Sequence, residues 1–120
     1  MNGFFFYRFN LSNYFYCMNR IERIQEMLKL SPNDHFLRHA LALEYIKEGN
    51  DVAARNLFEQ ILNEDESYVG SYYHLGKLLE RNGDTQLAIQ WYEKGMKIAN
   101  QVGDNHAYNE LQSAYEDLVY

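Results

Sequence analysis

The chain has 120 residues and a formal net charge of −6, which is enough for one domain with a modest hydrophobic core. Hydrophobic residues make up 47% of it and there is one proline, which is unlike the composition of a disordered chain. The excess of acidic residues disfavours nucleic-acid binding, which requires clustered Lys and Arg against the phosphates. Because Cys17 is the one cysteine, an internal disulfide and a cysteine-only metal site are both excluded.

Aromatic residues crowd the first 17 positions of the chain. Arg8, the one basic side chain there, lies inside the aromatic run, and no small-residue cleavage site follows, so the segment does not read as a secretory signal. No apolar run reaches the roughly 18 residues of a membrane span. We therefore expect a cytoplasmic protein without a membrane partner. The aromatic residues are Phe4, Phe5, Phe6, Tyr7, Phe9, Tyr14, Phe15 and Tyr16.

From residue 18 onward, apolar residues recur at the spacing of one helical face in six successive segments. Between segments stand turn and capping residues, for example Pro32 with Asp34, and Gly49 with Asn50. No strand pattern competes, so the prediction is all-α. A bundle of six unrelated helices is the alternative. The predicted helices span residues 19–30, 36–46, 51 to about 63, about 68–81, 85 to about 102 and 105 to about 119.

The pattern of these helices repeats after 34 residues, the length of one helix–turn–helix unit. Small residues recur where two helices would cross closely, and large apolar residues recur where hairpins would stack. The chain thereby resembles the tetratricopeptide repeat family, most clearly over residues 35–68 and 69–102. At this shift Leu41 aligns with Leu75, Ala42 with Gly76, Gly49 with Gly83, Ala54 with Ala88, and Phe58 with Tyr92.

The resemblance implies a right-handed α–α superhelix, a solenoid of about two full helix–turn–helix repeats. Residues 18–34 fit the second helix of a preceding half repeat, because Ile24 lies 34 positions before Phe58. Residues 103–120 fit at a spacing of 36, which aligns Leu75 with Leu111, and this predicts a C-terminal capping helix. The chain departs from the family at Arg38, where tryptophan is usual.

Residues 1–17 leave three interpretations open. The favoured one is an extension outside the fold, with the working protein beginning at Met18. A second is the first helix of the partial repeat, for which Phe4, Tyr7 and Leu11 have suitable spacing, although arginines would then occupy both small crossing positions. The third is a tail that binds a membrane surface or a partner through its aromatic residues.

No residue pattern predicts chemistry. His35 and His39 are four apart on one helix, as metal ligands can be, but no third ligand follows nearby and His74 and His106 are distant in sequence. No phosphate loop, nucleophile elbow or dinucleotide fingerprint is present. We therefore expect no enzyme activity, no cofactor and no metal.

The resemblance instead implies a groove, lined by the first helix of each hairpin, that binds a peptide or helix of a protein partner. Its apolar members suggest anchoring contacts, and its three cations suggest a local positive strip. Some family members grip acidic chaperone tails with a lysine–asparagine clamp. That clamp is absent, because its positions hold His39, Ala40, Leu43 and His74. The predicted groove residues are Phe36, His39, Leu43, Ile46, Lys47, Tyr73, Lys77, Glu80, Arg81 and Asn109, with Gly70 and Ser113 beside them.

The alternative to a peptide-binding adaptor is a self-associating structural unit. In that case the apolar groove residues would pack against one another or against a second copy of the chain, and the protein would be a homo-oligomer with no dedicated peptide ligand.

Overall fold

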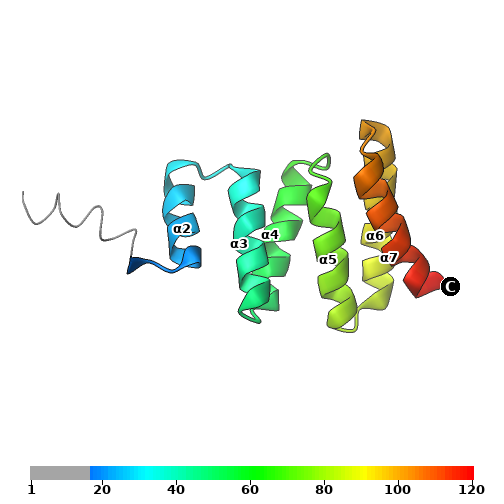
Figure 1. The fold of residues 1–120 in the computed structure, drawn as a ribbon, viewed down its shortest axis with the longest axis horizontal. Coiled ribbons are helices and arrows are strands. Elements are labelled where there is room, and N and C mark those ends of the chain that lie inside the picture. Colours follow the sequence, from blue (N-terminus) through cyan, green and yellow to red (C-terminus); the bar gives the residue numbers. More distant parts are fainter. Residues whose placement is uncertain (1–16) are drawn as a thin grey trace, which may run out of the picture.

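A computed structural model describes residues 17–120, and within them the chain forms six α-helices and no strand. The helices stand side by side in a row, with α2 at one end and α6 and α7 at the other (Figure 1). The interpretations of residues 1–16 lie outside the described residues. The helices are α2 (Arg20–Leu30), α3 (His35–Lys47), α4 (Asp51–Glu64), α5 (Gly70–Arg81), α6 (Thr85–Val102) and α7 (Asn105–Val119).

Side-chain caps fix where most of these helices begin. Asn19 and Glu22 form a reciprocal capping box, in which the Asn19 side chain accepts from the Glu22 backbone N–H at 2.8 Å. Asp34, Asn50 and Asp104 cap α3, α4 and α7 in the same way, by accepting a backbone N–H three residues ahead. The turns that end α3, α5 and α6 each contain a glycine with positive φ, as their sequences predict.

Helix α5 differs from the prediction, because it begins at Gly70 and not at about residue 68. The Asp65 carboxylate accepts hydrogen bonds from the Ser67 backbone N–H at 3.0 Å and from the Ser67 hydroxyl at 2.6 Å. These side-chain hydrogen bonds hold residues 65–67 in a local turn, which competes with an earlier start of the helix. Tyr72 then ties the turn to α5, since its hydroxyl donates to the Glu66 carbonyl at 2.8 Å.

The core is built on close crossings of paired helices. Ala42 and Ala54 are fully buried in the α3–α4 pair, and Gly76 takes the equivalent place between α5 and α6. A Cβ atom added at Gly76 would lie well inside van der Waals contact with the Tyr92 ring. Large buried side chains then fill the space between the pairs. They are Phe58, Leu62, Tyr72, Leu75, Leu79, Tyr92 and Leu111.

Two departures from the family pattern have structural explanations. Arg38, where tryptophan is usual, is buried and its guanidinium pairs with the Glu64 carboxylate. Helix α7 packs against α6 and α5, and Leu111 is buried as Leu75 is, so the spacing of 36 places these two residues equivalently. Gln112, which aligns with the tightly enclosed Gly76, is only half-buried because no described helix covers that side of α7.

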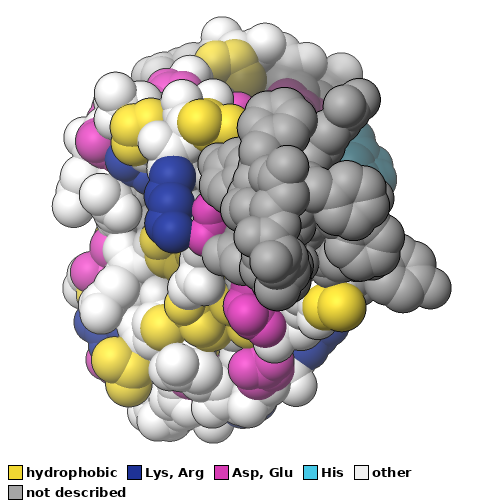
Figure 2. Space-filling model, turned by 90° about the vertical axis from the view of Figure 1, so that its left-hand side faces the viewer, with side chains coloured by type: hydrophobic (Ala, Val, Ile, Leu, Met, Phe, Trp, Pro, Cys, Tyr) yellow, Lys and Arg dark blue, Asp and Glu magenta, His cyan; other side chains and the backbone are white. Residues whose placement is uncertain are grey.

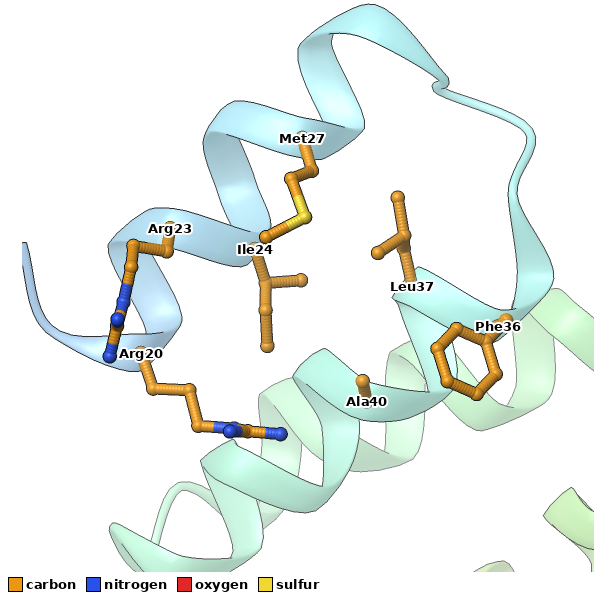
Figure 3. Close-up of a pocket in the computed structure, with 7 residues that line it drawn as sticks. All are labelled: Arg20, Arg23, Ile24, Met27, Phe36, Leu37 and Ala40. Atoms are coloured by element: carbon orange, nitrogen blue, oxygen red, sulfur yellow. The ribbon is translucent and has the colours of Figure 1, made fainter. Parts of the chain in front are cut away.

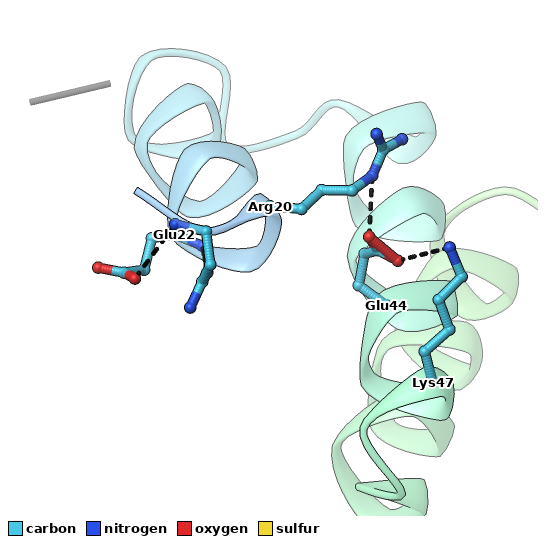
Figure 4. A network of polar contacts seen from close by, with 5 residues as sticks. Arg20, Glu22, Glu44 and Lys47 are labelled. Carbon is cyan, nitrogen blue, oxygen red and sulfur yellow. Dashed lines mark hydrogen bonds and ion pairs between the residues drawn. The ribbon is translucent and has the colours of Figure 1, made fainter. Parts of the chain in front are cut away.

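Polar contacts attach α2 to the rest of the described fold. The buried Glu44 carboxylate pairs with Arg20 at 2.9 Å and with Lys47 at 3.1 Å, while Glu22 stays with its own helix cap (Figure 4). Ile24 is the one buried residue within α2. The junction between α2 and α3 is therefore less apolar than the junctions further along the row.

The enclosure of Gly76 predicts a difference between two glycines of the same helix. We expect Gly76→Ala to lower the free energy of unfolding by about 1–3 kcal/mol or more, because its methyl group must displace the Tyr92 ring. Gly70→Ala is the matched control. Its Cβ would meet nothing nearer than 3.9 Å, so we expect no loss, and a gain of up to about 1 kcal/mol. Urea unfolding of both variants measures this, and equal stabilities would contradict it.

Candidate partner-binding groove

His39 lies at the centre of an aromatic cluster that joins α3 to α5. Its Nδ1 atom is 2.9 Å from the Ser71 hydroxyl oxygen, and its ring centroid is 5.5 Å from that of Phe58 and 5.7 Å from that of Tyr68. The His74 ring is nearer still, at 5.3 Å. Stacked repeats thus bring together side chains from three helices and a turn.

His74 was predicted to be distant from His39, and in the structure this is wrong. The two residues are 35 positions apart, which is one repeat plus one position, so stacking α5 beside α3 places their rings in contact. His35 lies nearby, with its ring 6.1 Å from Tyr68. Even so, no group of three His, Cys, Asp or Glu residues in the described part of the chain could hold a metal ion.

Burial sets the protonation of this cluster. Loss of solvation, and after it the neighbouring His74, lower the pKa of His39 from 6.5 to about 4. Burial also lowers the pKa of His74, although the Glu110 carboxylate on α7 acts in the opposite direction. The His39 and His74 rings are therefore neutral at physiological pH, and they pack as aromatic groups.

An open cavity of about 440 Å³ adjoins the cluster, between the start of α3 and the start of α5. Phe36 at its rim is 69% exposed. Gly70 contributes no side chain, which leaves the space open. The turn residues are absent from the groove predicted from the sequence, although their place directly before α5 is a signal that could have found them. The lining residues are Phe36, His39, Ser67, Tyr68, Val69 and Gly70.

The other apolar residues of the predicted groove are less available than expected. Leu43, Ile46 and Tyr73 are half-buried, and all three pack against the core. Among the four predicted apolar anchors, Phe36 is therefore the one that is mainly exposed. Asn109, on α7, is also exposed.

The expected positive strip is paired with carboxylates in the structure. Lys47 lies 3.1 Å from Glu44, Lys77 lies 3.5 Å from Glu80, and Arg81 lies 2.5 Å from Asp51. Glu80 also accepts the hydroxyl hydrogen of Tyr92, and the Lys77 ammonium stands 5.9 Å from the centroid of the Tyr73 ring. These pairings offset the positive charge that the sequence suggested for the groove.

A second cavity, of about 260 Å³, opens between α2 and α3 (Figure 3). Figure 2 views the molecule from this end and shows hydrophobic side chains on the surface beside charged ones. This cavity was not predicted from the sequence. Phe36 belongs to its wall as well as to that of the first cavity. The residues that line it are Arg20, Arg23, Ile24, Met27, Phe36, Leu37 and Ala40.

Comparison with known proteins supports the helical-repeat fold. Residues 69–102 match the tetratricopeptide repeat. The chain is 44% identical to the tetratricopeptide repeat domain protein of Salinibacter ruber, whose crystal structure superimposes with a TM-score of 0.68 over 71% of this chain and 94% of that one. The chain belongs to the tetratricopeptide repeat family.

Two further proteins are also similar to this chain. A solution structure of a Bordetella parapertussis protein has a TM-score of 0.73 at 30% identity, over 84% of this chain and 88% of that one. A TPR repeat-containing protein of Pseudomonas aeruginosa is 29% identical over 91 residues, which is 76% of this chain and 87% of the relative. In the described part of this tetratricopeptide repeat protein, no helix is long and apolar enough to cross a membrane.

The lowered pKa of His39 predicts that the fold weakens in mild acid. The unfolded chain takes up this proton near pH 6.5, whereas folded His39 stays neutral down to about pH 4. Its contribution is thus complete above pH 6.5 and declines as the pH falls toward 4. Because the ring is only half-buried and water screens part of the effect, we expect a loss of about 1 kcal/mol between pH 7 and pH 5.

Urea unfolding at several pH values tests this expectation. The variant His39→Gln should show a smaller loss of stability between pH 7 and pH 5 than the wild-type chain. His106→Gln, at an exposed position on α7, is the control and should behave as wild type. Identical pH dependence in His39→Gln and wild type would contradict the assignment.

Proposed function

We propose that this protein is a non-enzymatic adaptor that binds a peptide or helix of a partner protein in the groove formed by α3, α5 and α7. Repeats of this family generally mediate protein–protein interaction. The observation that carries the proposal is the exposed Phe36 ring beside the open cavity between α3 and α5. An aromatic ring at a cavity rim is the kind of group that anchors a binding interface.

The chemistry of the cavity indicates what the ligand would place there. Its walls include the Phe36 and Tyr68 rings and the His39 ring, which is neutral at physiological pH. An uncharged imidazole and two aromatic rings favour an apolar or aromatic side chain over a charged one. The groove cations already have carboxylate partners, so the ligand needs no strongly acidic segment.

The remainder of the groove suits a supporting role. Leu43, Ile46 and Tyr73 are half-buried, and together they offer a shallow apolar surface next to the paired charges of Lys77 and Glu80. Such a surface excludes water around an anchor without contributing large contacts of its own. We therefore expect most of the binding energy to come from the anchor beside Phe36.

Filling the cavity tests the proposal. Peptides would first be selected from a displayed library against the 120-residue chain, and their affinities measured by calorimetry. We expect Gly70→Leu to weaken a selected peptide at least tenfold, which corresponds to about 1.4 kcal/mol, because the new side chain occupies the cavity. Its stability should not fall, since a Cβ at Gly70 meets nothing nearer than 3.9 Å.

Two further variants complete this experiment. Gln90→Leu adds the same side chain at an exposed position on α6 and should leave affinity unchanged. The double variant Tyr73→Ala with Lys77→Glu, made in the wild-type background, removes the supporting surface and should also weaken peptide binding. Wild-type affinity in both folded groove variants would show that the peptide binds elsewhere.

A further inference from the structure

The two ends of the described fold carry complementary halves of one repeat. Helix α2 occupies the place of a second helix, since Ile24 aligns with Phe58 and Tyr92, but no described helix stands before it as its partner. Helix α7 occupies the place of a first helix, since Leu111 aligns with Leu75, and no described helix follows it. Among the described residues, each end of the row lacks the type of helix that the other end presents.

We propose that α7 of one copy of this chain docks against α2 and α3 of a second copy, head to tail, and completes a repeat between them. The occupant of the cavity between α2 and α3 is then a second copy of the chain. This inference is independent of the proposed peptide groove, because it uses the two ends of the row and not the face between them.

The packing of α5 on α6 shows how the two helices would meet. There Gly76 faces the Tyr92 ring, and Tyr72 lies beside Gly95 and the Trp91 ring, 6.0 Å between ring centroids. Transferred by the repeat spacing, the same contacts join α7 of one copy to α2 of the next. The corresponding pairs are Gln112 with Ile24, and Tyr108 with Met27 and Arg23.

The cavity between α2 and α3 provides an apolar floor for such a helix. Met27 is 45% exposed at its edge, and Ile24, Leu37 and Ala40 line it. Within the chain, the equivalents of Leu37 and Ala40 are Ser71 and His74, which are the α5 residues that contact His39 of α3. The cavity therefore lies where the repeat pattern places a first helix.

Charge favours a second copy as the occupant. Helix α7 carries three exposed carboxylates, Glu110, Glu116 and Asp117, and neither lysine nor arginine. None of the three forms an ion pair within residues 17–120. The facing wall of the cavity carries the exposed Arg23, and the exposed Arg20, which also pairs with Glu44. Opposite charges on the two surfaces steer their approach and fix their register.

The same alignment places individual charges opposite one another. In the α5–α6 pair, the Glu80 carboxylate reaches across to the Tyr92 hydroxyl. Glu116 is the equivalent of Glu80, and the turn of α2 that it would face contains Arg20. Arg23 has no ion pair among the described residues and adjoins the position of Tyr108, where its guanidinium can stack on the ring.

The contact should be weaker than the joints within the chain. Both small crossing positions are lost, because Gln112 replaces glycine and Arg20 replaces alanine. The helices then cannot approach as closely as α5 and α6 do. A head-to-tail contact also uses different surfaces on the two partners, so it extends into chains or rings of copies. We expect association that depends on concentration and weakens with salt.

Sedimentation velocity of the 120-residue chain, up to millimolar concentration, tests the proposal with two end-specific variants. Met27→Glu blocks the α2 end by facing the α7 carboxylates with another anion, and Gln112→Lys blocks the α7 end by facing Arg20 and Arg23 with another cation. Each variant alone should be monomeric. A mixture of the two should form a one-to-one dimer, because each still has one intact end. Gln90→Lys, with the same change at an exposed site on α6, should associate as wild type.

Three results would overturn this inference. They are a wild-type chain that stays monomeric throughout, a blocked variant that associates as wild type does, and two monomeric variants that fail to pair in the mixture. Circular dichroism melting confirms that each variant is folded. Peptide affinity of Met27→Glu, measured at a concentration where the wild-type chain is monomeric, should remain at the wild-type value, so failure here is distinguishable from failure of the groove proposal.

Discussion

The close approach of two helices within each hairpin is the constraint on which the rest of the structure depends. Gly76 lets the α6 backbone carry the Tyr92 ring directly against α5, and Ala42 with Ala54 permits the same approach between α3 and α4. At this distance the Tyr92 ring is fully buried and burial raises the pKa of its hydroxyl, whose hydrogen goes to Glu80.

Much of the fold could be predicted because the close crossings require small residues, and these recur in the sequence at a fixed interval. Helix ends were predictable where a single capping side chain or a glycine decides them, as at Asp34 and Gly103. The start of α5 was not, because the Asp65–Ser67 turn competes with the helix for the same backbone and propensity alone does not rank the two. The structure of residues 1–16 stays a prediction.

The candidate site was less predictable than the fold. The repeat register places residues on one face of a helix, and it put Phe36 and His39 on the same face of α3, where both line one cavity. It does not give the exposure of Leu43 or Ile46, which depends on how far adjacent hairpins slide over one another. Nor does register show that Arg81 forms an ion pair, because its partner Asp51 lies on another helix. The cavities arise between elements, so no single segment encodes them.

The Phe36 side chain forms part of the wall of both cavities, so one aromatic ring stands at the boundary between the end of the row and its groove. If an occupant of one cavity changed the affinity of the other cavity for its own occupant, the effect would be reciprocal and equal in both directions. A substitution at Phe36 therefore alters the walls of both proposed sites at once.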